Sequence, residues 1–347
     1  MSWHFLPATR FAEQAPRWRQ LHATGDASPL LADDFVAALL ADLARGDEVL
    51  GWLERDGQTL AMTVLAPQGK GVWNTFQPPQ APVGIWLQHP GLKTGEELAR
   101  LLRALPGPAL LLGLTQCDPD LLARAPNSPA ARSLDYHSTA RITLSGGFGA
   151  YWNARGKNLR ANLKKQRARL AREGIATRLQ VSRERHEMAA AVADFGQLES
   201  AGWKGKGGTA VGGGAAQSRF YERMLEAFSA RGAACVYRYW IGEQLAAMDL
   251  CVEGRDSFIV LKTTYDEQRA GTFSPALLMR EEALRGLFDE GRFARLEFYG
   301  KVMEWHTRWT DEVRTLYHMT QYRWPLLARL HDWRQRTMTS RSKHVFE

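Results

Sequence analysis

Apolar and polar positions in the second half of the chain change from a strand period to a helix period, with a short polar stretch between them. Residues 258–264 are rich in β-branched and aromatic side chains, which is typical of a strand. Residues 268–273 are polar with one glycine and predict a loop. Ser274 suits an N-cap, Pro275 suits the first helical position, and Gly291 can end the helix. The apolar positions at helical spacing are Leu277, Leu278, Ala283, Leu284, Leu287 and Phe288.

The turn from this strand into this helix has a chemical use. The first N–H groups of a helix lack partners within the helix and carry a partial positive charge, so they bind phosphate or pyrophosphate groups. Gly271 allows close approach of the backbone, and Arg269 adds positive charge. A purely structural interpretation stays open at this point, because many connections between a strand and a helix have this composition.

The remaining elements of the second half follow the same two periods. Helices are expected at 157–173, 184–199 and 218–230, and strands at 139–144, 175–181, 233–240, 244–252, 295–298 and 313–319. A hairpin turn is expected at Gly242-Glu243, and the meandering strands are expected to be antiparallel. The glycine-rich residues 202–214 predict a loop that can serve as a lid over a cleft, with Trp203 and Lys204 at its hinge. A surface connector with a packed tryptophan is the structural alternative.

The first 145 residues predict a mixed unit of helices and strands. Residues 35–43 form a helix with Asp33 or Asp34 as its cap, and Asp56-Gly57 is a strong hairpin signal. Strands are expected at 49–54, 59–65, 72–76, 84–87 and 109–114, and a helix begins at Thr94 and ends before the prolines at 106–108. No phosphate-binding loop is visible in this unit.

The second half resembles the acyl-CoA-binding core of the GNAT acetyltransferase superfamily. It is more similar to the CelD (cellulose-biosynthesis) type, which is distantly related to the Fem-type aminoacyltransferases. The resemblance covers roughly residues 150–310, and its order and spacing are more specific than any one motif. The segments that carry it are Glu199-Ser-Ala-Gly-Trp203-Lys204, Lys262-Thr-Thr-Tyr265-Asp266, Gln268-x-x-Gly271, Ser274-Pro275, Glu297-Phe-Tyr-Gly300 and Arg308-Trp309. Phe273 departs from the family pattern, which has a small residue there.

The resemblance implies an α+β fold of two tandem GNAT-like domains, each with a mostly antiparallel central sheet flanked by helices. The expected domains are a degenerate GNAT-like domain at 1–145, a catalytic domain at 146–323, and a basic C-terminal helix and tail at 324–347. It implies acetyl-CoA or another acyl-CoA as co-substrate. The residues implied to bind it are Gln268, Arg269, Gly271, Ser274, Pro275 and Ala276.

Acyl transfer from a thioester needs a proton acceptor for the attacking group and stabilisation of the oxyanion, and polar residues near the cofactor helix are the candidates. Tyr265 would protonate the departing thiolate, and Lys262 would bind an anionic acceptor or polarise a carbonyl. Glu199 and Asp249 are candidate general bases, and His306 stands where relatives have lysine and titrates in a suitable range. Each of these side chains also has a structural interpretation, as a packed or ion-paired residue. Candidate acceptor-binding residues are Trp203, Lys204, Glu297, Tyr299, Arg308 and Trp309.

A formal net charge of +8 favours anionic partners. Most of the local excess lies in the predicted helix at 157–173, whose basic residues are Lys157, Arg160, Lys164, Lys165, Arg167, Arg169 and Arg172. This helix is interpreted either as a solvated face or as a surface that attracts phosphate groups of a substrate or nucleic acid. It has no interleaved aromatic residues for stacking bases, so nucleic acid is not the expected partner.

The three cysteines, Cys117, Cys235 and Cys251, have no metal-binding spacing and are expected to be buried, reduced thiols, so no metal site is predicted. No signal peptide or membrane span is visible, which predicts a cytoplasmic protein. The leading hypothesis is an acyl-CoA-dependent N- or O-acyltransferase in which a small-molecule or saccharide acceptor attacks the thioester directly, in polysaccharide or envelope metabolism. The alternatives are a Fem-like transferase that uses aminoacyl-tRNA, and a catalytically silent GNAT-fold binding or regulatory protein.

Overall fold

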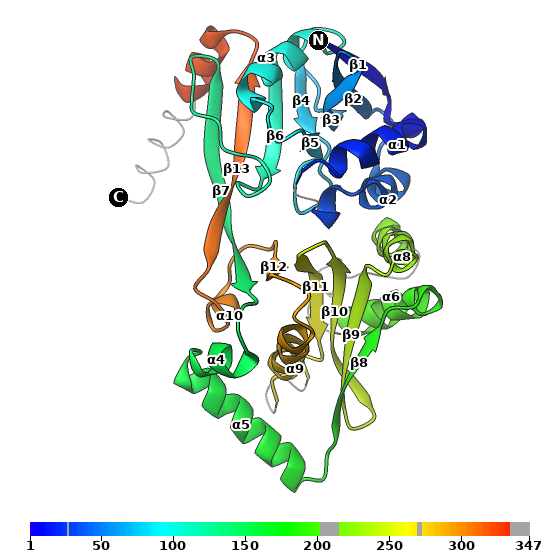
Figure 1. The fold of residues 1–347 in the computed structure, drawn as a ribbon, viewed down its shortest axis with the longest axis vertical. Helices are drawn as coiled ribbons and strands as arrows, with labels where there is room; N and C mark the ends of the chain where they lie inside the picture. Colours follow the sequence, from blue (N-terminus) through cyan, green and yellow to red (C-terminus); the bar gives the residue numbers. More distant parts are fainter. Residues whose placement is uncertain (26–27, 202–214, 269–272, 334–347) are drawn as a thin grey trace. The chain divides into compact units, whose positions relative to one another are not determined.

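The chain folds into two compact units, as seen in a computed structural model that describes residues 1–25, 28–201, 215–268 and 273–333 (Figure 1). The first unit comprises Met1–Leu40, Ala44–His137 and the C-terminal segment from Thr315. The second comprises Ser138–Arg314 together with the short segment Ala41–Leu43. Both units combine helices with a mostly antiparallel sheet, so the expected α+β class is confirmed. Whether the first unit is a degenerate second copy stays a prediction.

Six strands of the first unit follow the order β1-β2-β3-β4-β6-β13, and β5 pairs with β3. All pairs within it are antiparallel except β4 with β6. The elements are β1 (Ser2–Pro7), α1 (Phe11–His22), α2 (Asp33–Leu43), β2 (Val49–Arg55), β3 (Gln58–Pro67), β4 (Val72–Thr75), β5 (Trp86–Gln88), α3 (Thr94–Ala104), β6 (Leu111–Cys117) and β13 (Val313–Tyr322). The hairpin between β2 and β3 turns at Asp56 and Gly57, both with positive φ, as this dipeptide predicts.

The second unit has the strand order β7-β12-β11-β10-β9-β8, and β7 belongs to it only from Ser138 onward. Its strands pair antiparallel except β11 with β12, which are parallel because α9 crosses over between them. The elements are β7 (Ala131–Thr143), α4 (Phe148–Asn153), α5 (Lys157–Arg172), β8 (Thr177–Ser182), α6 (Arg185–Ser200), α8 (Ala216–Ser229), β9 (Ala234–Ile241), β10 (Gln244–Glu253), β11 (Ser257–Tyr265), α9 (Pro275–Glu290), β12 (Arg295–Phe298) and α10 (Glu304–Thr307).

A buried apolar cluster of the second unit includes one face of α9. Apolar side chains of α9, among them Leu278, Leu284 and Leu287, are buried against Phe258 and Val260 of β11. This contact uses the apolar stripe that predicted the helix, and burial of such side chains is the main stabilising contribution of the helix.

The thiols of all three cysteines are buried and unpaired, as expected.

Several boundaries differ from expectation for identifiable reasons. The N-cap of α2 is Ala32, and the two aspartates expected as caps lie in the first turn instead. Strand β7 begins eight residues earlier than the predicted start at Thr139. Helix α1 and strand β1 were not predicted, because Pro16 interrupts the helical pattern and β1 covers only six residues.

The last strand belongs to the first unit from Thr315 onward, although the sequence had placed it in a domain at 146–323. The reason is its antiparallel pairing with β6, from Tyr317 opposite Cys117 to Tyr322 opposite Leu111. In the described part of the chain, none of the helices has the length and apolar character needed to cross a membrane.

Candidate functional site

The connection from β11 to α9 has the local structure that the sequence predicts. Ser274 is the N-cap, Pro275 begins α9, and Gly291 ends it with a φ of 61° in the left-handed region. Before the connection, the amide of Gln268 donates to Oδ1 of Asp266 at 2.9 Å. The predicted cofactor-binding residues Arg269 and Gly271 lie outside the described residues.

Ser274 is held by a residue of α5 and does not cap its own helix. Its amide donates to Oε1 of Gln166 at 2.6 Å, and Nε2 of Gln166 donates to its hydroxyl at 3.2 Å. The hydroxyl makes no capping hydrogen bond to the first turn of α9. The first turn is therefore left without a side-chain cap, which is the local condition for receiving an anion. Ala276 lies in this turn and is partly exposed.

Phe273, the departure from the family pattern, is a core residue here. Its side chain is buried in the main cluster of the second unit, and the guanidinium of Arg169 lies 5.1 Å from the centroid of its ring. A large side chain is accommodated before α9 because it points into the core.

Strands β11 and β12 separate beyond a short parallel ladder. Their pairing runs from Ser257 opposite Arg295 to Val260 opposite Phe298. Strand β11 then continues to Tyr265, whereas β12 ends at Phe298. The register between β10 and β11 also shifts next to this point, at Leu250. The second half of β11 thus has its edge free of β12, beside the N-terminus of α9.

Lys262 of β11 forms an ion pair with Glu199 of α6. The ammonium lies 3.2 Å from each carboxylate oxygen, and the Glu199 side chain is almost completely buried. The centroids of the Phe195 and Tyr221 rings lie 5.7 and 5.8 Å from the ammonium. Burial, and secondarily the charge of Glu199, raises the pKa of Tyr221. Two of the five predicted catalytic residues are therefore in direct contact.

Asp249 belongs to a second cluster that faces α9. Thr263, the neighbour of Lys262, donates its hydroxyl to Oδ1 of Asp249 at 2.5 Å, and Arg280 lies 2.8 Å from Oδ2. Successive side chains of a strand point to opposite faces, so Lys262 and Thr263 direct their clusters to the two faces of the sheet. Burial raises the pKa of Asp249, and the Arg280 charge and the Thr263 hydrogen bond oppose this shift. The Asp249 carboxylate is thus occupied by two partners.

His306 lies next to this buried arginine. The ring of Phe298 contacts both residues, with the Arg280 guanidinium 5.1 Å and the His306 ring 5.3 Å from its centroid. The backbone N–H of Met303 donates to Nδ1 of His306 at 2.9 Å, so Nδ1 is an acceptor. Burial lowers the pKa of His306 to about 4, and the Arg280 charge acts in the same direction. His306 is therefore neutral at pH 7.

This shift predicts a pH dependence of stability. The folded pKa of about 4 lies below the value of about 6.5 in the unfolded chain. Between these values the unfolded state binds more protons, so the free energy of unfolding decreases as pH falls from about 6.5 toward 4. We expect His306→Asn to remove this component of the pH dependence, measured by urea unfolding across that range. His186→Asn, at an exposed position, is the control; if both variants have the same slope as the parent, His306 is not buried in its neutral form.

The other predicted site residues are distributed differently. Tyr265, at the end of β11, is exposed over 39% of its surface and is available to a ligand. Glu297 and Tyr299 are buried beside Arg314, which pairs with Glu297 at 2.7 Å. Trp309 is fully buried in the core, and its backbone carbonyl accepts from Tyr151 and Arg155. Arg308 is exposed and pairs with Glu304 at 2.8 Å. Trp203 and Lys204 lie outside the described residues.

Two residues that sequence reasoning missed organise the site, and both leave a signal in the pattern. Gln166 follows Leu159 and Leu163 on the apolar seam of α5, so a polar side chain there points inward. Arg280 lies between Leu277 and Leu284 on the apolar stripe of α9 and is buried. A polar residue at a position where the helical pattern expects an apolar one indicates a buried side chain with a polar partner. In the described ranges, no group of three or more His, Cys, Asp or Glu residues is placed to hold a metal ion.

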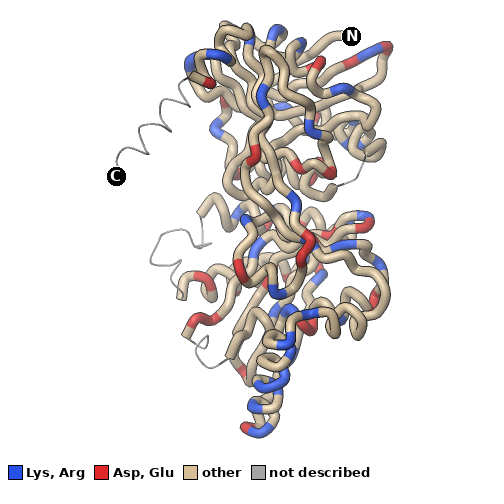
Figure 2. The backbone as a smooth tube through the Cα atoms, turned by 90° about the vertical axis from the view of Figure 1, so that its left-hand side faces the viewer, with Lys and Arg blue, Asp and Glu red and all other residues tan. Residues whose placement is uncertain are grey.

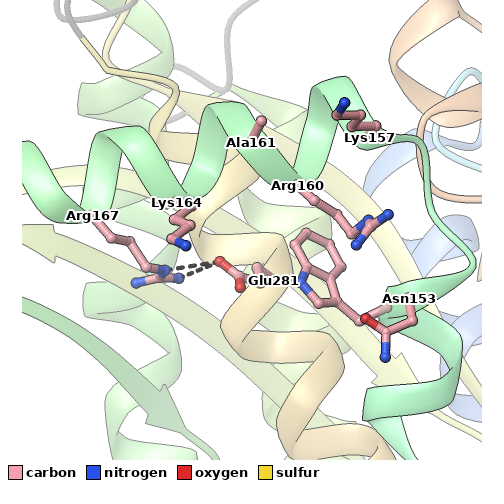
Figure 3. A pocket seen from close by; sticks show the side chains of 8 residues that line it. Asn153, Lys157, Arg160, Ala161, Lys164, Arg167 and Glu281 are labelled. Atoms are coloured by element: carbon pink, nitrogen blue, oxygen red, sulfur yellow. Dashed lines mark hydrogen bonds and ion pairs between the residues drawn. The ribbon is translucent and has the colours of Figure 1, made fainter.

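A pocket of about 460 Å³ lies between α4, α5 and α9 (Figure 3). Side chains of α5 supply most of its charge, and Figure 2 shows Lys and Arg along most of this helix. The lining residues are Trp152, Asn153, Lys157, Arg160, Ala161, Lys164, Arg167 and Glu281.

Comparison with known proteins agrees with this geometry. Residues 157–307 match the family model described as an acetyltransferase (GNAT) domain. The range includes both clusters and the connection between β11 and α9. No curated protein matches the chain.

Three solved structures share the fold. One is the C-terminal domain (DUF2156) of a putative lysylphosphatidylglycerol synthetase from Agrobacterium fabrum, with 14% identity, a TM-score of 0.57, and coverage of 89% of this chain and 92% of that one. Another is a conserved protein of unknown function from Bacteroides thetaiotaomicron, with 10% identity, a TM-score of 0.56, and coverage of 89% and 97%. The third is FemX, with 8% identity, a TM-score of 0.55, and coverage of 93% and 97%. At such identities the likeness concerns the fold alone. The second unit is thus similar to a GNAT acetyltransferase domain over residues 157–307.

Proposed function

We propose that the protein is an acyl-CoA-dependent N- or O-acyltransferase in which the acceptor attacks the thioester directly within a ternary complex. The observation that carries the proposal is the uncapped N-terminus of α9 beside the free edge of β11, within the range that matches the GNAT domain. A helix N-terminus suits the diphosphate of the acyl donor. The free edge of β11 is a place for the extended part of the same molecule, since exposed strand edges pair with extended groups.

The proposed chemical roles follow from exposure and charge. Tyr265, exposed at the end of β11, protonates the departing thiolate. Lys262 polarises the carbonyl or holds an anionic acceptor, and Glu199 keeps its ammonium in place. Asp249 and Arg280 hold β10, β11 and α9 together, which makes them positioning residues. We leave Trp309 out of the acceptor site because it is fully buried. A saccharide or another small molecule is the proposed acceptor.

Acetyl-CoA is expected to raise the melting temperature of the protein, because a ligand that binds only the native state stabilises it by about 2.7 kcal/mol at a hundred times its dissociation constant. Ser274→Tyr and Gly271→Leu are expected to abolish this shift, since a bulky side chain at the N-cap, or three residues before it in the sequence, excludes the diphosphate. Differential scanning fluorimetry with and without acetyl-CoA measures both effects. Gly286→Ala, on an exposed position of the same helix with no atom near the added methyl, is the control.

Two outcomes contradict the assignment. If millimolar acetyl-CoA does not change the melting temperature, acetyl-CoA is not the acyl donor. An undiminished shift in the folded Ser274 and Gly271 variants places the donor elsewhere.

An aminoacyl-tRNA-dependent transfer is the second candidate function. The basic helix α5 favours it, because seven Lys and Arg side chains on one helix suit a phosphate backbone. A purified protein that forms product from aminoacyl-tRNA and none from acetyl-CoA establishes this alternative. A protein that binds acetyl-CoA and turns over neither donor is a silent binding protein.

A further inference from the structure

The pocket between α4, α5 and α9 has a strongly uneven charge. Four cationic side chains and one carboxylate line it. The carboxylate, Glu281, is buried and already paired with Arg167 at 2.8 Å. Lys157, Arg160 and Lys164 form no ion pair with any residue that the structure describes. Three cations therefore face this pocket without acidic partners.

These cations are arranged on one side of α5. Positions 157, 160, 164 and 167 recur at helical spacing, and Lys157 and Lys164 are about 10 Å apart along the helix axis. Figure 3 shows Arg160, Lys164 and Arg167 pointing from α5 toward the side on which Glu281 and Asn153 lie. Arg160 also donates from Nε to the backbone carbonyl of Arg155 at 3.0 Å, which orients its guanidinium. Arg160 and Lys164, one turn apart, are close enough to engage two neighbouring phosphate groups.

Trp152 adds an aromatic surface to the same pocket. It is half-buried and stacks on Phe148, with ring centroids 5.8 Å apart and an interplanar angle of 14°. The centroid of the Trp309 ring lies 6.0 Å from that of Trp152, at an interplanar angle of 31°. A tryptophan held in this way is a platform for a planar ring. The volume of about 460 Å³ is that of a small-molecule site.

We propose that this pocket binds a nucleoside diphosphate group, with the diphosphate on Arg160 and Lys164 and the base on Trp152. The site is separate from the N-terminus of α9 and needs no acyl transfer for its detection. Because the diphosphate of the acyl donor is assigned to the N-terminus of α9, the source that fits this separate pocket is a nucleotide-activated acceptor. A pocket of limited volume with one aromatic platform fits such a group better than it fits a long polynucleotide, whose phosphates need an extended track.

Isothermal titration calorimetry with ADP tests the proposal. We expect Lys164→Ala and Arg160→Ala to weaken ADP binding at least about tenfold, because each loses a charge-assisted hydrogen bond. Lys165→Ala and Arg172→Ala remove the same charges from exposed positions of α5 outside the pocket, and we expect changes within about twofold. Alanine is a good helix former, so all four variants should fold, which circular dichroism checks.

The role of Trp152 is tested by comparing the binding of ADP with that of inorganic pyrophosphate. ADP should bind more tightly than inorganic pyrophosphate, and Trp152→Leu should remove this advantage while pyrophosphate binding persists. Equal affinity for ADP and pyrophosphate in the parent protein overturns the role of the base.

Competition with coenzyme A tests whether the pocket is a second site. If coenzyme A displaces ADP, and the Arg160 and Lys164 variants also raise KM for the acyl donor, the pocket takes the donor's nucleotide and the proposal of a separate site is overturned. If coenzyme A and ADP bind together, the pocket serves a second ligand. Equal weakening in the Lys164 and Lys165 variants, or no ADP binding at low salt, overturns the proposal. Binding of a single-stranded oligonucleotide that depends equally on all four positions assigns α5 to nucleic acid instead. None of these outcomes depends on turnover.

Discussion

Arg280→Met is expected to lower the free energy of unfolding by about 3–5 kcal/mol, the cost of leaving a buried charge without its partner. Both side chains of the Asp249–Arg280 pair are buried, and their charged atoms lie 2.8 Å apart. Methionine fills a similar volume, so the lowered free energy of unfolding reflects mainly the missing charge and only secondarily a change in packing. Urea denaturation measured by circular dichroism gives the value.

The matched control is Arg285→Met, because Arg285 lies on the same helix with about half of its side chain exposed. We expect its effect to stay within about 0.5 kcal/mol. The double variant Asp249→Leu with Arg280→Met should recover most of the loss, since apolar replacement of a whole buried pair is often neutral. A cost below about 1 kcal/mol for Arg280→Met alone means that water reaches the pair, and Asp249 then becomes available again as a general base.

Lys262→Met is expected to reduce kcat/KM for acyl transfer at least about tenfold, because this ammonium is the cation proposed to act on the carbonyl or the acceptor. The variant also removes a cation from beside the buried Glu199 carboxylate, which lowers stability independently of the chemistry. The rate is therefore measured by steady-state kinetics at a temperature where the variant is folded, and it is compared with the rate of a second variant.

The double variant Lys262→Met with Glu199→Gln removes both charges of this ion pair. If Lys262 acts in the transition state, the double variant stays as slow as Lys262→Met while its stability recovers. If it regains the rate of the parent protein, Lys262 has a structural role only. Tyr265→Phe isolates the exposed hydroxyl, and its unchanged rate would exclude Tyr265 as the acid that protonates the thiolate.

Local signals in the sequence determined the elements that frame the site. The turn pairs Asp56-Gly57 and Gly242-Glu243 placed two hairpins, and Ser274-Pro275 and Gly291 placed both ends of α9. These succeed because turn and cap geometry depends on a few neighbouring residues. The departure at Phe273 was also visible, but its outcome was not, since a large side chain before a helix can point either into the core or into a ligand site.

Tertiary structure alone decided which of these residues meet. Gln166 reaches Ser274 across 108 positions, and Lys262 reaches Glu199 across 63. Adjacent residues of β11 separate onto two faces of the sheet, so one predicted catalytic set became two clusters. The last strand joined the first unit because its backbone pairs with β6. Periodicity reports which face of an element is buried, whereas the partner depends on the packing of the whole chain, which no local pattern contains.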